Sequence, residues 1–317
     1  MKKLFFSVDA HGANLVWRKW LSAVNMYHAD ILILSGDLTG KVFVPIIKQN
    51  DGTWQYSYFG TTFTLKNEDE VKAAVDRLDN AAIYPFIATG AEVSELQKDE
   101  KKLQDLMNKL IWDRLDQWLK MLVKAVDTSK VMTIVMPGND DFFIFDDLIK
   151  SYANKGVIYP LDEAIQFPYG IEMVSCAYVN PTPWNTDREA DEGKLEKMLE
   201  TEINRLKDPH WSIFNFHAPP HNTKLDIAPK LDKTLKPVVS FGDVDTEHVG
   251  SKAVRKVEEK YQPLMGVHGH IHESFASDYI KKTPVVNPGS EYSEGILRAF
   301  IIEIEENGIK NFWKIEG

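Results

Sequence analysis

Short apolar runs, each stopped abruptly by small or polar residues, are the feature that most limits how this chain can fold. They occur at residues 4–8, 31–34, 131–136, 213–216, 264–267 and 285–286. Runs of this length are typical of strands buried on both faces of a sheet. Between several of them lie amphipathic stretches with the helical spacing of sheet-covering helices, at 13–26, 142–153, 187–206 and 247–261. The pattern predicts an α/β protein.

Composition and net charge limit the kinds of molecule that the chain is expected to bind. The chain has 317 residues, of which 44% are hydrophobic and 26% charged, as is typical of globular proteins. Its formal net charge is −10, from 37 basic and 47 acidic residues. Such an acidic balance disfavours a surface that binds nucleic acid through many phosphate contacts. A nucleic-acid partner is therefore not expected.

The chain also carries hints about its compartment. Its single cysteine, Cys176, lies within an apolar run at 173–179, so it predicts a buried strand thiol and allows no intrachain disulfide. The apolar start at 4–8 is interrupted by Asp9 and His11 before a signal-peptide core can form. Since no apolar run approaches the roughly 18 residues of a membrane span, we expect a cytoplasmic protein without a membrane partner.

The segment 41–130 departs from the rhythm of strands and helices. Residues 42–48 and 53–65 predict antiparallel strands that turn at 50–52 and near Gly60, which is a hairpin signal. An apolar stripe at three- and four-residue spacing then predicts one long helix over about 98–127. We expect core packing for the stripe. Whether this insertion also caps a site, or joins two copies of the chain into an oligomer, stays open.

Potential metal ligands stand where the predicted strands end, which is where sites form in open α/β sheets. They are Asp9, His11, Asp37, Asn139, His217, His270 and His272. Taken singly, Asp37 could be a helix cap, Asn139 an Asx turn and His217 a structural histidine. Three histidines within residues 268–272 are harder to explain as core. Two divalent ions close together need a bridging carboxylate with oxygen and imidazole ligands, and this set offers both.

The ordered blocks Asp-x-His, Gly-Asp, Gly-Asn, His and Gly-His-x-His resemble the calcineurin-like metallophosphoesterase superfamily, and they run from residue 9 to residue 272. The stretches 217–226 and 248–251 look like those of a subgroup of small prokaryotic members. The resemblance implies a four-layer α/β fold, a sandwich of two mixed β-sheets flanked by helices. It implies one domain over residues 1–317, with only the insertion at 41–130 outside the family pattern.

The resemblance also implies how the ligands divide. Asp37 would bridge both ions, with Asp9, His11 and His272 on one ion and Asn139, His217 and His270 on the other. Two divalent metal ions are implied, manganese or iron first, with zinc or cobalt as alternatives. The implied reaction is hydrolysis of a small phosphate mono- or diester by a metal-bridging hydroxide.

One residue departs from the family pattern. The family usually has a histidine after Gly-Asn, and this chain has Asp140 there. That histidine helps to protonate or steady the leaving group, a contribution worth roughly 10²–10⁴-fold for poor leaving groups. A carboxylate in its place would repel phosphate unless it is protonated or turned away. We therefore expect a bias toward acidic leaving groups.

Further residues are candidates for supporting roles. His221, four residues beyond His217, is the candidate substitute for the absent histidine, and the alternative is an exposed loop residue. His248 and His268 could contact substrate or orient a ligand, with a structural role as the alternative. Asp141 is expected to support the Asn139 turn or to orient a neighbouring imidazole.

Two other functions remain open. The chain could be a non-catalytic scaffold that keeps this fold and binds a protein partner through the insertion. The seven retained ligand types argue against a scaffold, and the absent histidine argues weakly for one. A nuclease is the other alternative, and the acidic balance makes it the less favoured enzyme.

Overall fold

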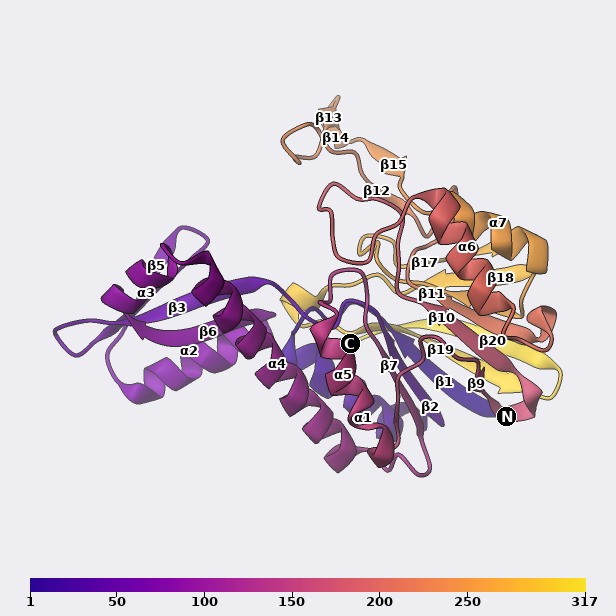
Figure 1. The fold of residues 1–317 in the computed structure, drawn as a ribbon, viewed down its shortest axis with the longest axis horizontal. Helices are drawn as coiled ribbons and strands as arrows, with labels where there is room; N and C mark the ends of the chain where they lie inside the picture. The colour runs from indigo at the N-terminus through magenta and orange to yellow at the C-terminus, as the bar shows by residue number, and fades with distance from the viewer.

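A computed structural model describes all residues from 1 to 317. Its centre is a pair of six-stranded mixed sheets packed face to face (Figure 1). In order across it, the first sheet contains β20 (Gly308–Glu316), β19 (Arg298–Glu305), β1 (Lys2–Ser7), β2 (Ile31–Ser35), β7 (Met132–Met136) and β8 (Val157–Ile158). The second contains β17 (Ala276–Ile280), β18 (Thr283–Asn287), β16 (Met265–Val267), β11 (Ser212–Phe216), β10 (Glu172–Cys176) and β9 (Ile165–Gln166).

Alternation of side chains along the strands creates the layers. In β1, Leu4 and Phe6 lie in the cluster between the two sheets, whereas Phe5 belongs to the cluster under the helices. The outer face of the first sheet is covered by α1 (Asn14–Tyr27), α4 (Glu100–Ala125) and α5 (Ile144–Lys150). The outer face of the second is covered by α6 (Glu192–Ile203) and α7 (Lys252–Tyr261). The predicted sandwich of two mixed sheets flanked by helices is confirmed.

The insertion forms a lobe beside the sandwich (Figure 1). It has its own small hydrophobic cluster and a four-stranded sheet in the order β5-β4-β3-β6. Its elements are β3 (Val42–Lys48), β4 (Trp54–Tyr58), β5 (Thr61–Leu65), α2 (Glu68–Asn80), β6 (Ile83–Thr89) and α3 (Gly90–Leu96), followed by α4. The strand β6 stands where the sequence predicts only helices. It contains Pro85, which an edge strand such as β6 can accommodate.

Helix α4 joins the lobe to the sandwich. Its apolar stripe is buried from Ile111 to Leu122, where Trp118 stacks on Trp17 of α1 at 4.6 Å between ring centroids. Arg114 donates to the carbonyl oxygen of Gly12 at 3.0 Å, just after β1. The expectation of core packing for the stripe is met, and the same helix links the lobe to the loop that carries His11.

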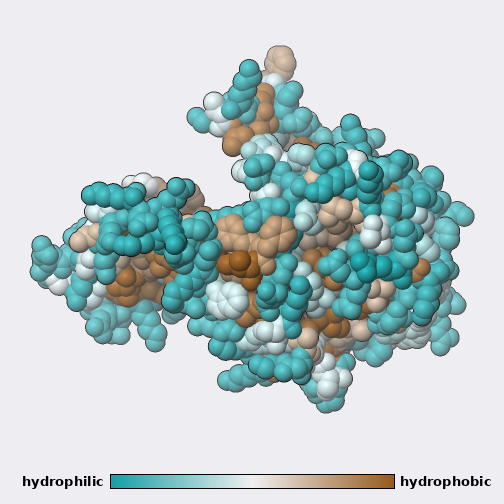
Figure 2. All heavy atoms as spheres, viewed as in Figure 1, coloured by the Kyte–Doolittle hydropathy of each residue, from teal (hydrophilic) through white to brown (hydrophobic).

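A second excursion, residues 227–248, projects as an arm from the top of the sandwich in this view, above α6 and α7 (Figure 1). It consists of β12 (Ile227–Pro229), β13 (Val239–Ser240), β14 (Asp243–Val244) and β15 (Thr246–His248). Hydrophilic residues cover most of the visible surface, with hydrophobic patches on the arm, on the lobe and where the lobe meets the sandwich (Figure 2). No helix combines the length and apolar character that crossing a membrane requires.

Candidate metal centre

Polar residues follow five strands, three from the first sheet and two from the second. Asp9 and His11 come after β1, Asp37 after β2 and Asn139 after β7. His217 comes after β11, and two further histidines at 270 and 272 follow β16. Since the strands of each set run parallel to one another, their carboxyl ends meet at one edge of the sandwich. The seven candidate ligands therefore gather at one edge from segments that lie far apart along the chain.

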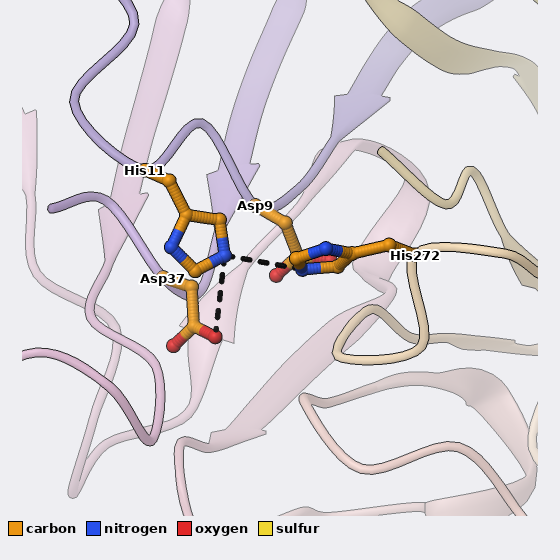
Figure 3. A group of neighbouring side chains, drawn as sticks. All are labelled: Asp9, His11, Asp37 and His272. Carbon is orange, nitrogen blue, oxygen red and sulfur yellow. Dashed lines mark hydrogen bonds and ion pairs between the residues drawn. The ribbon is translucent and has the colours of Figure 1, made fainter. Parts of the chain in front are cut away.

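Their donor atoms form two compact groups. Asp9, His11, Asp37 and His272 each place one ligand atom within 4.8 Å of the others (Figure 3). Within this group, the Nε2 atoms of His11 and His272 are 3.1 Å apart, and His11 Nε2 is 3.7 Å from Asp37 Oδ2. The second group combines Asp37, His217 and His270 at the same spacing. Asp37 belongs to both groups, the arrangement that a bridging carboxylate needs.

Asn139 lies beside the second group. Its flanking residues both approach Asp37, because the backbone N–H of Asp140 donates to Asp37 Oδ1 at 2.9 Å and Gly138 packs against that same carboxylate. The side-chain amide of Asn139 donates to Thr186 Oγ1 at 2.9 Å. This fixes the amide orientation and leaves the carbonyl oxygen buried with no hydrogen-bond partner.

The backbone of the ligand loops adopts conformations that side chains rarely take. Asp9, His11, Asp37 and His270 all have left-handed φ angles, of 52°, 44°, 44° and 69°. Such strain in residues other than glycine concentrates at functional sites. At Gly36, also left-handed with φ of 90°, a Cβ atom would lie 2.0 Å from His217 Nδ1. The Gly-Asp motif therefore needs its glycine for space as well as for the turn.

Negative charge is concentrated on the shared carboxylate. Burial opposes ionisation of Asp37, but neighbouring His217 holds its pKa well below the usual range. Burial raises the pKa of Asp9 to about 7, and the nearby charge of Asp37 contributes. Although burial works the other way, the Asp37 and Asp9 carboxylates raise the pKa of His217 to about 9. Two carboxylates buried together repel each other, and a cation between them relieves that repulsion.

The two histidines after β16 are kept neutral. Burial and the neighbouring His217 lower the pKa of His270 to about 4, and burial and His11 lower the pKa of His272 to about 3. A neutral imidazole has a free lone pair, which is the form that binds a metal ion. Near neutral pH both rings can therefore accept a cation without first losing a proton.

These residues fit a pair of divalent cations. Asp9 Oδ1, Asn139 Oδ1 and both ring nitrogens of His217 are buried and have no hydrogen-bond partner. Unpartnered buried polar atoms are rare and need an explanation, and an ion that they coordinate supplies one. The donors are oxygen and imidazole nitrogen only, a set that suits manganese, iron, zinc or cobalt. Cys176 belongs to neither ligand group, and burial raises the pKa of its thiol to about 12.

Asp141 holds two ligand loops together. Its buried carboxylate accepts hydrogen bonds from the backbone N–H groups of Leu38, Thr39 and Gly138 at 2.8–2.9 Å, and from the Thr39 hydroxyl at 2.6 Å. It thus supports the Asn139 turn, one of the two roles expected for it, and also fixes the loop after Asp37.

Replacement of Asp141 by Asn is expected to weaken metal binding about 10–100-fold, the usual effect of losing a group that orients ligands. The amide would point an N–H toward backbone donors, which also costs about 1–3 kcal/mol of folding stability. Titration calorimetry with manganese measures the change in affinity. Asp147→Asn, at an exposed position of α5, is the matched control. Unchanged affinity in Asp141→Asn would contradict the positioning role.

Arg188 is a residue of this centre that sequence reasoning misses. It is almost fully buried, donates to the carbonyl oxygens of Gly138 and Asp141, and pairs with Asp146 at 2.6 Å. The only signal in the sequence would have been an arginine inside a predicted amphipathic helix. In the structure it lies before α6, in a loop packed against the Asn139 turn.

A lysine and a histidine lie near the two carboxylate oxygens of Asp140. Lys41 Nζ lies 2.6 Å from Asp140 Oδ1, and His11 Nδ1 lies 3.9 Å from Asp140 Oδ2. The lysine is the first residue of the insertion and nothing in the sequence connects it with the ligand set. Tyr292 is a second neighbour that the sequence does not indicate, with its ring 4.6 Å from that of His11 and 5.7 Å from that of His272.

His221 and His248 meet at a buried carboxylate. His248 Nδ1 lies 2.7 Å from Asp226 Oδ1, and His221 Nδ1 lies 3.5 Å from Asp226 Oδ2. Asn287 Nδ2 links this loop to the metal loop, since it donates to the carbonyl oxygens of Leu225, Gly269 and Ile271. Both imidazoles are partly exposed, at 31% for the His221 side chain and 39% for the His248 side chain.

His268 has a different environment. Its ring is buried, with Nδ1 2.8 Å from the Phe216 carbonyl oxygen and 3.0 Å from that of Ala218. Its Nε2 is 3.1 Å from the buried carboxylate of Glu258. Both nitrogens are engaged within the second sheet and α7, so no polar atom of the ring faces a substrate. The two carbonyl oxygens flank His217, so a role in orienting that candidate ligand and a structural role both stay predictions for His268.

Comparisons with known proteins agree with this description. No protein-family model matches the chain. The uncharacterized protein MJ1162 of Methanocaldococcus jannaschii is 32% identical over 174 residues, which make up 54% of this chain and 70% of that protein. One solved structure matches with a TM-score of 0.58 at 16% identity, covering 99% of this chain and 98% of its own. TT1561 of Thermus thermophilus matches with a TM-score of 0.54 at 13% identity, covering 99% and 97%.

At 16% and 13% identity, the two solved structures indicate the fold alone. MJ1162, at 32% identity, indicates the family. The five ordered sequence blocks, brought to one edge of a two-sheet sandwich around a shared Asp37, agree with both. The chain belongs to the family of MJ1162, and its two-sheet sandwich and ordered candidate ligands resemble those of the calcineurin-like metallophosphoesterase superfamily.

Proposed function

We propose that this protein is a phosphoesterase that uses two divalent metal ions to hydrolyse a small phosphate mono- or diester. The observation that carries the proposal is the membership of Asp37 in two ligand groups at once. The single hydrogen bond that this buried carboxylate accepts from the Asp140 N–H gives it no need for two sets of imidazoles. A centre that holds two cations together does need both sets around one carboxylate.

The proposed division of ligands follows the two groups. Asp9, His11 and His272 hold one ion with Asp37, and His217, His270 and Asn139 hold the other. When bound, such a pair supplies Lewis-acid charge and lowers the pKa of water beside the ester. The chain's own part is to fix the seven donors on strained loops and to exclude water from their far side, since most of them are buried.

Partly exposed groups around the ligands are the proposed substrate contacts. They are Asp140 with its ion-pair partner Lys41, and the pair His221 and His248, whose loop Asn287 links to the loop of His270 and His272. The buried Asp226 carboxylate holds His248 by Nδ1, so Nε2 is the ring nitrogen that could accept a hydrogen bond or a proton at the ester. A small substrate is proposed because an acidic chain offers little attraction to a long polyanion.

Metal content and turnover on one sample test the proposal. Elemental analysis is expected to give close to two metal ions per chain after loading with manganese. Hydrolysis of p-nitrophenyl phosphate and bis-p-nitrophenyl phosphate, each with and without manganese, should depend on the metal. The better substrate of the two would decide between monoester and diester. Absence of both bound metal and turnover would refute the proposal and favour a scaffold that binds a partner through the lobe.

A further inference from the structure

A cation lies beside the ligand groups without being part of them. The ammonium nitrogen of Lys41 is 2.6 Å from Asp140 Oδ1. Asp140 in turn is fixed at the centre, because its backbone N–H donates to Asp37 at 2.9 Å and its other oxygen lies 3.9 Å from His11 Nδ1. The lysine is thus one ion pair away from the shared carboxylate.

The backbone that presents Lys41 is firmly placed. The preceding residue, Gly40, donates its N–H to the Tyr84 hydroxyl at 3.2 Å. A Cβ atom on Gly40 would lie 2.4 Å from the His11 carbonyl oxygen, so the chain passes directly against the loop of a candidate ligand. Thr39 is held by Asp141 at 2.8 Å. The lysine therefore starts from a rigid base, unlike a lysine on a mobile surface loop.

The Lys41 ammonium can donate further hydrogen bonds besides the one to Asp140. It lies 4.6 Å from the centre of the Phe142 ring, and 31% of the side chain is exposed. An ammonium has three N–H groups, and the single contact with Asp140 uses one of them. The others can reach a ligand that enters from solvent. At the same time, the lysine neutralises a carboxylate that would otherwise repel a phosphate group.

We propose that Lys41 is a substrate-binding residue whose ammonium contacts the leaving-group oxygen of the phosphoester. In the hydrolysis, the oxygen of water bonds to phosphorus as that water loses one proton to solvent, and the bond to the leaving oxygen breaks with its electron pair remaining on that oxygen. Lys41 stays protonated and donates a hydrogen bond to this developing charge, and solvent supplies the proton of the released alcohol. Positioned donors of this kind stabilise the charge that forms in the transition state.

The inference rests on the proposed phosphoesterase function and extends it to the substrate class. Because Lys41 neutralises Asp140 and supplies a hydrogen-bond donor, we expect the protein to hydrolyse esters of ordinary alcohols as well as esters with acidic leaving groups. This differs from the bias that Asp140 alone predicts. The substrates assigned are small phosphate esters of weakly acidic alcohols or phenols.

Lys41→Met is the test, on the metal-loaded protein, with aryl phosphates whose leaving phenols differ in acidity. We expect kcat/KM to fall about 10²–10³-fold for the least acidic phenol and less than about tenfold for p-nitrophenol, so that the dependence on leaving-group acidity becomes steeper. Lys41→Arg keeps the charge and should restore much of the shallow dependence. Lys48→Met, an exposed lysine of the same lobe, is the matched control. An unchanged dependence in Lys41→Met would overturn the proposal.

Binding of inorganic phosphate, measured by calorimetry with two manganese ions bound, gives a reading independent of turnover. Lys41→Met is expected to weaken it on the order of tenfold, while metal content stays as in the unmodified protein. If the unmodified protein binds metal but hydrolyses no ester, the proposed function fails and this measurement still decides whether Lys41 binds the phosphoryl group. Equal phosphate affinity in both proteins would refute that role.

Discussion

Replacing Asp37 by Asn is expected to reduce phosphoester hydrolysis by at least about 10³-fold. The carboxylate is the one residue shared by both ligand groups, and it carries most of the negative charge between them. A neutral amide gives up the charge that holds two cations together, and metal ions supply several kcal/mol of transition-state stabilisation. At about 1.4 kcal/mol for each factor of ten, the loss reaches three orders of magnitude.

The measurement is kcat/KM for bis-p-nitrophenyl phosphate and p-nitrophenyl phosphate at saturating manganese, with elemental analysis of the same samples. We expect the metal content of Asp37→Asn to fall from about two ions to one or fewer per chain. Asp69→Asn, an exposed acid at the start of α2, serves as the control and should behave as the unmodified protein. Turnover preserved in Asp37→Asn would remove Asp37 from the bridging position.

Replacing Arg188 by Met is expected to lower the free energy of unfolding by about 3–5 kcal/mol, the range for breaking a buried ion pair from one side. The side chain is 1% exposed, and its loss removes the cation paired with Asp146 and the guanidinium donor to the carbonyl oxygens of Gly138 and Asp141. Because these carbonyls belong to the Asn139 turn, the variant should also bind its second metal ion more weakly. Urea unfolding of the metal-free protein measures the first effect.

A second arginine, Arg205, is the control that shows whether the loss of stability comes from burial of the guanidinium or from its charge alone. Arg205 pairs with Glu202 at 2.9 Å, but 38% of its side chain is exposed. Because the arginine is partly in solvent, although only 11% of the Glu202 side chain is exposed, Arg205→Met should cost less stability than Arg188→Met. If both variants lose the same stability, the special role assigned to Arg188 is wrong. If Arg188→Met unfolds more easily but keeps its metal affinity at low urea, the arginine is structural without positioning Asn139.

The sequence predicts much of the sandwich because its signals are local. Apolar runs such as 31–34 are stopped by glycine and a ligand, and this period and punctuation are visible without any knowledge of neighbours. The turn at 50–52 is equally readable, and β4 follows it. The strand β6 could not be predicted in the same way, because its proline indicates the end of a strand. Only the folded lobe places that proline on an edge strand, where it is tolerated.

The candidate site shows the same division. The identity of the seven candidate ligands follows from residue types at strand ends, in an order that matches a known family. The environment of His268 does not follow from the sequence. Only the packed structure shows that both ring nitrogens contact groups of the second sheet and α7. Nor does the sequence predict the pairing of His248 with the buried Asp226, which is 22 residues away along the chain.

By itself, then, the sequence determined the fold class, the strand ends and the ligand types, because each depends on the chemistry of a few adjacent residues. The tertiary structure alone decided which charges meet. Lys41 reaches Asp140 across 99 residues, and Arg188 reaches Gly138 across 50. Such contacts depend on how separate loops pack on a common scaffold, and no local pattern of apolar or polar residues encodes that distance.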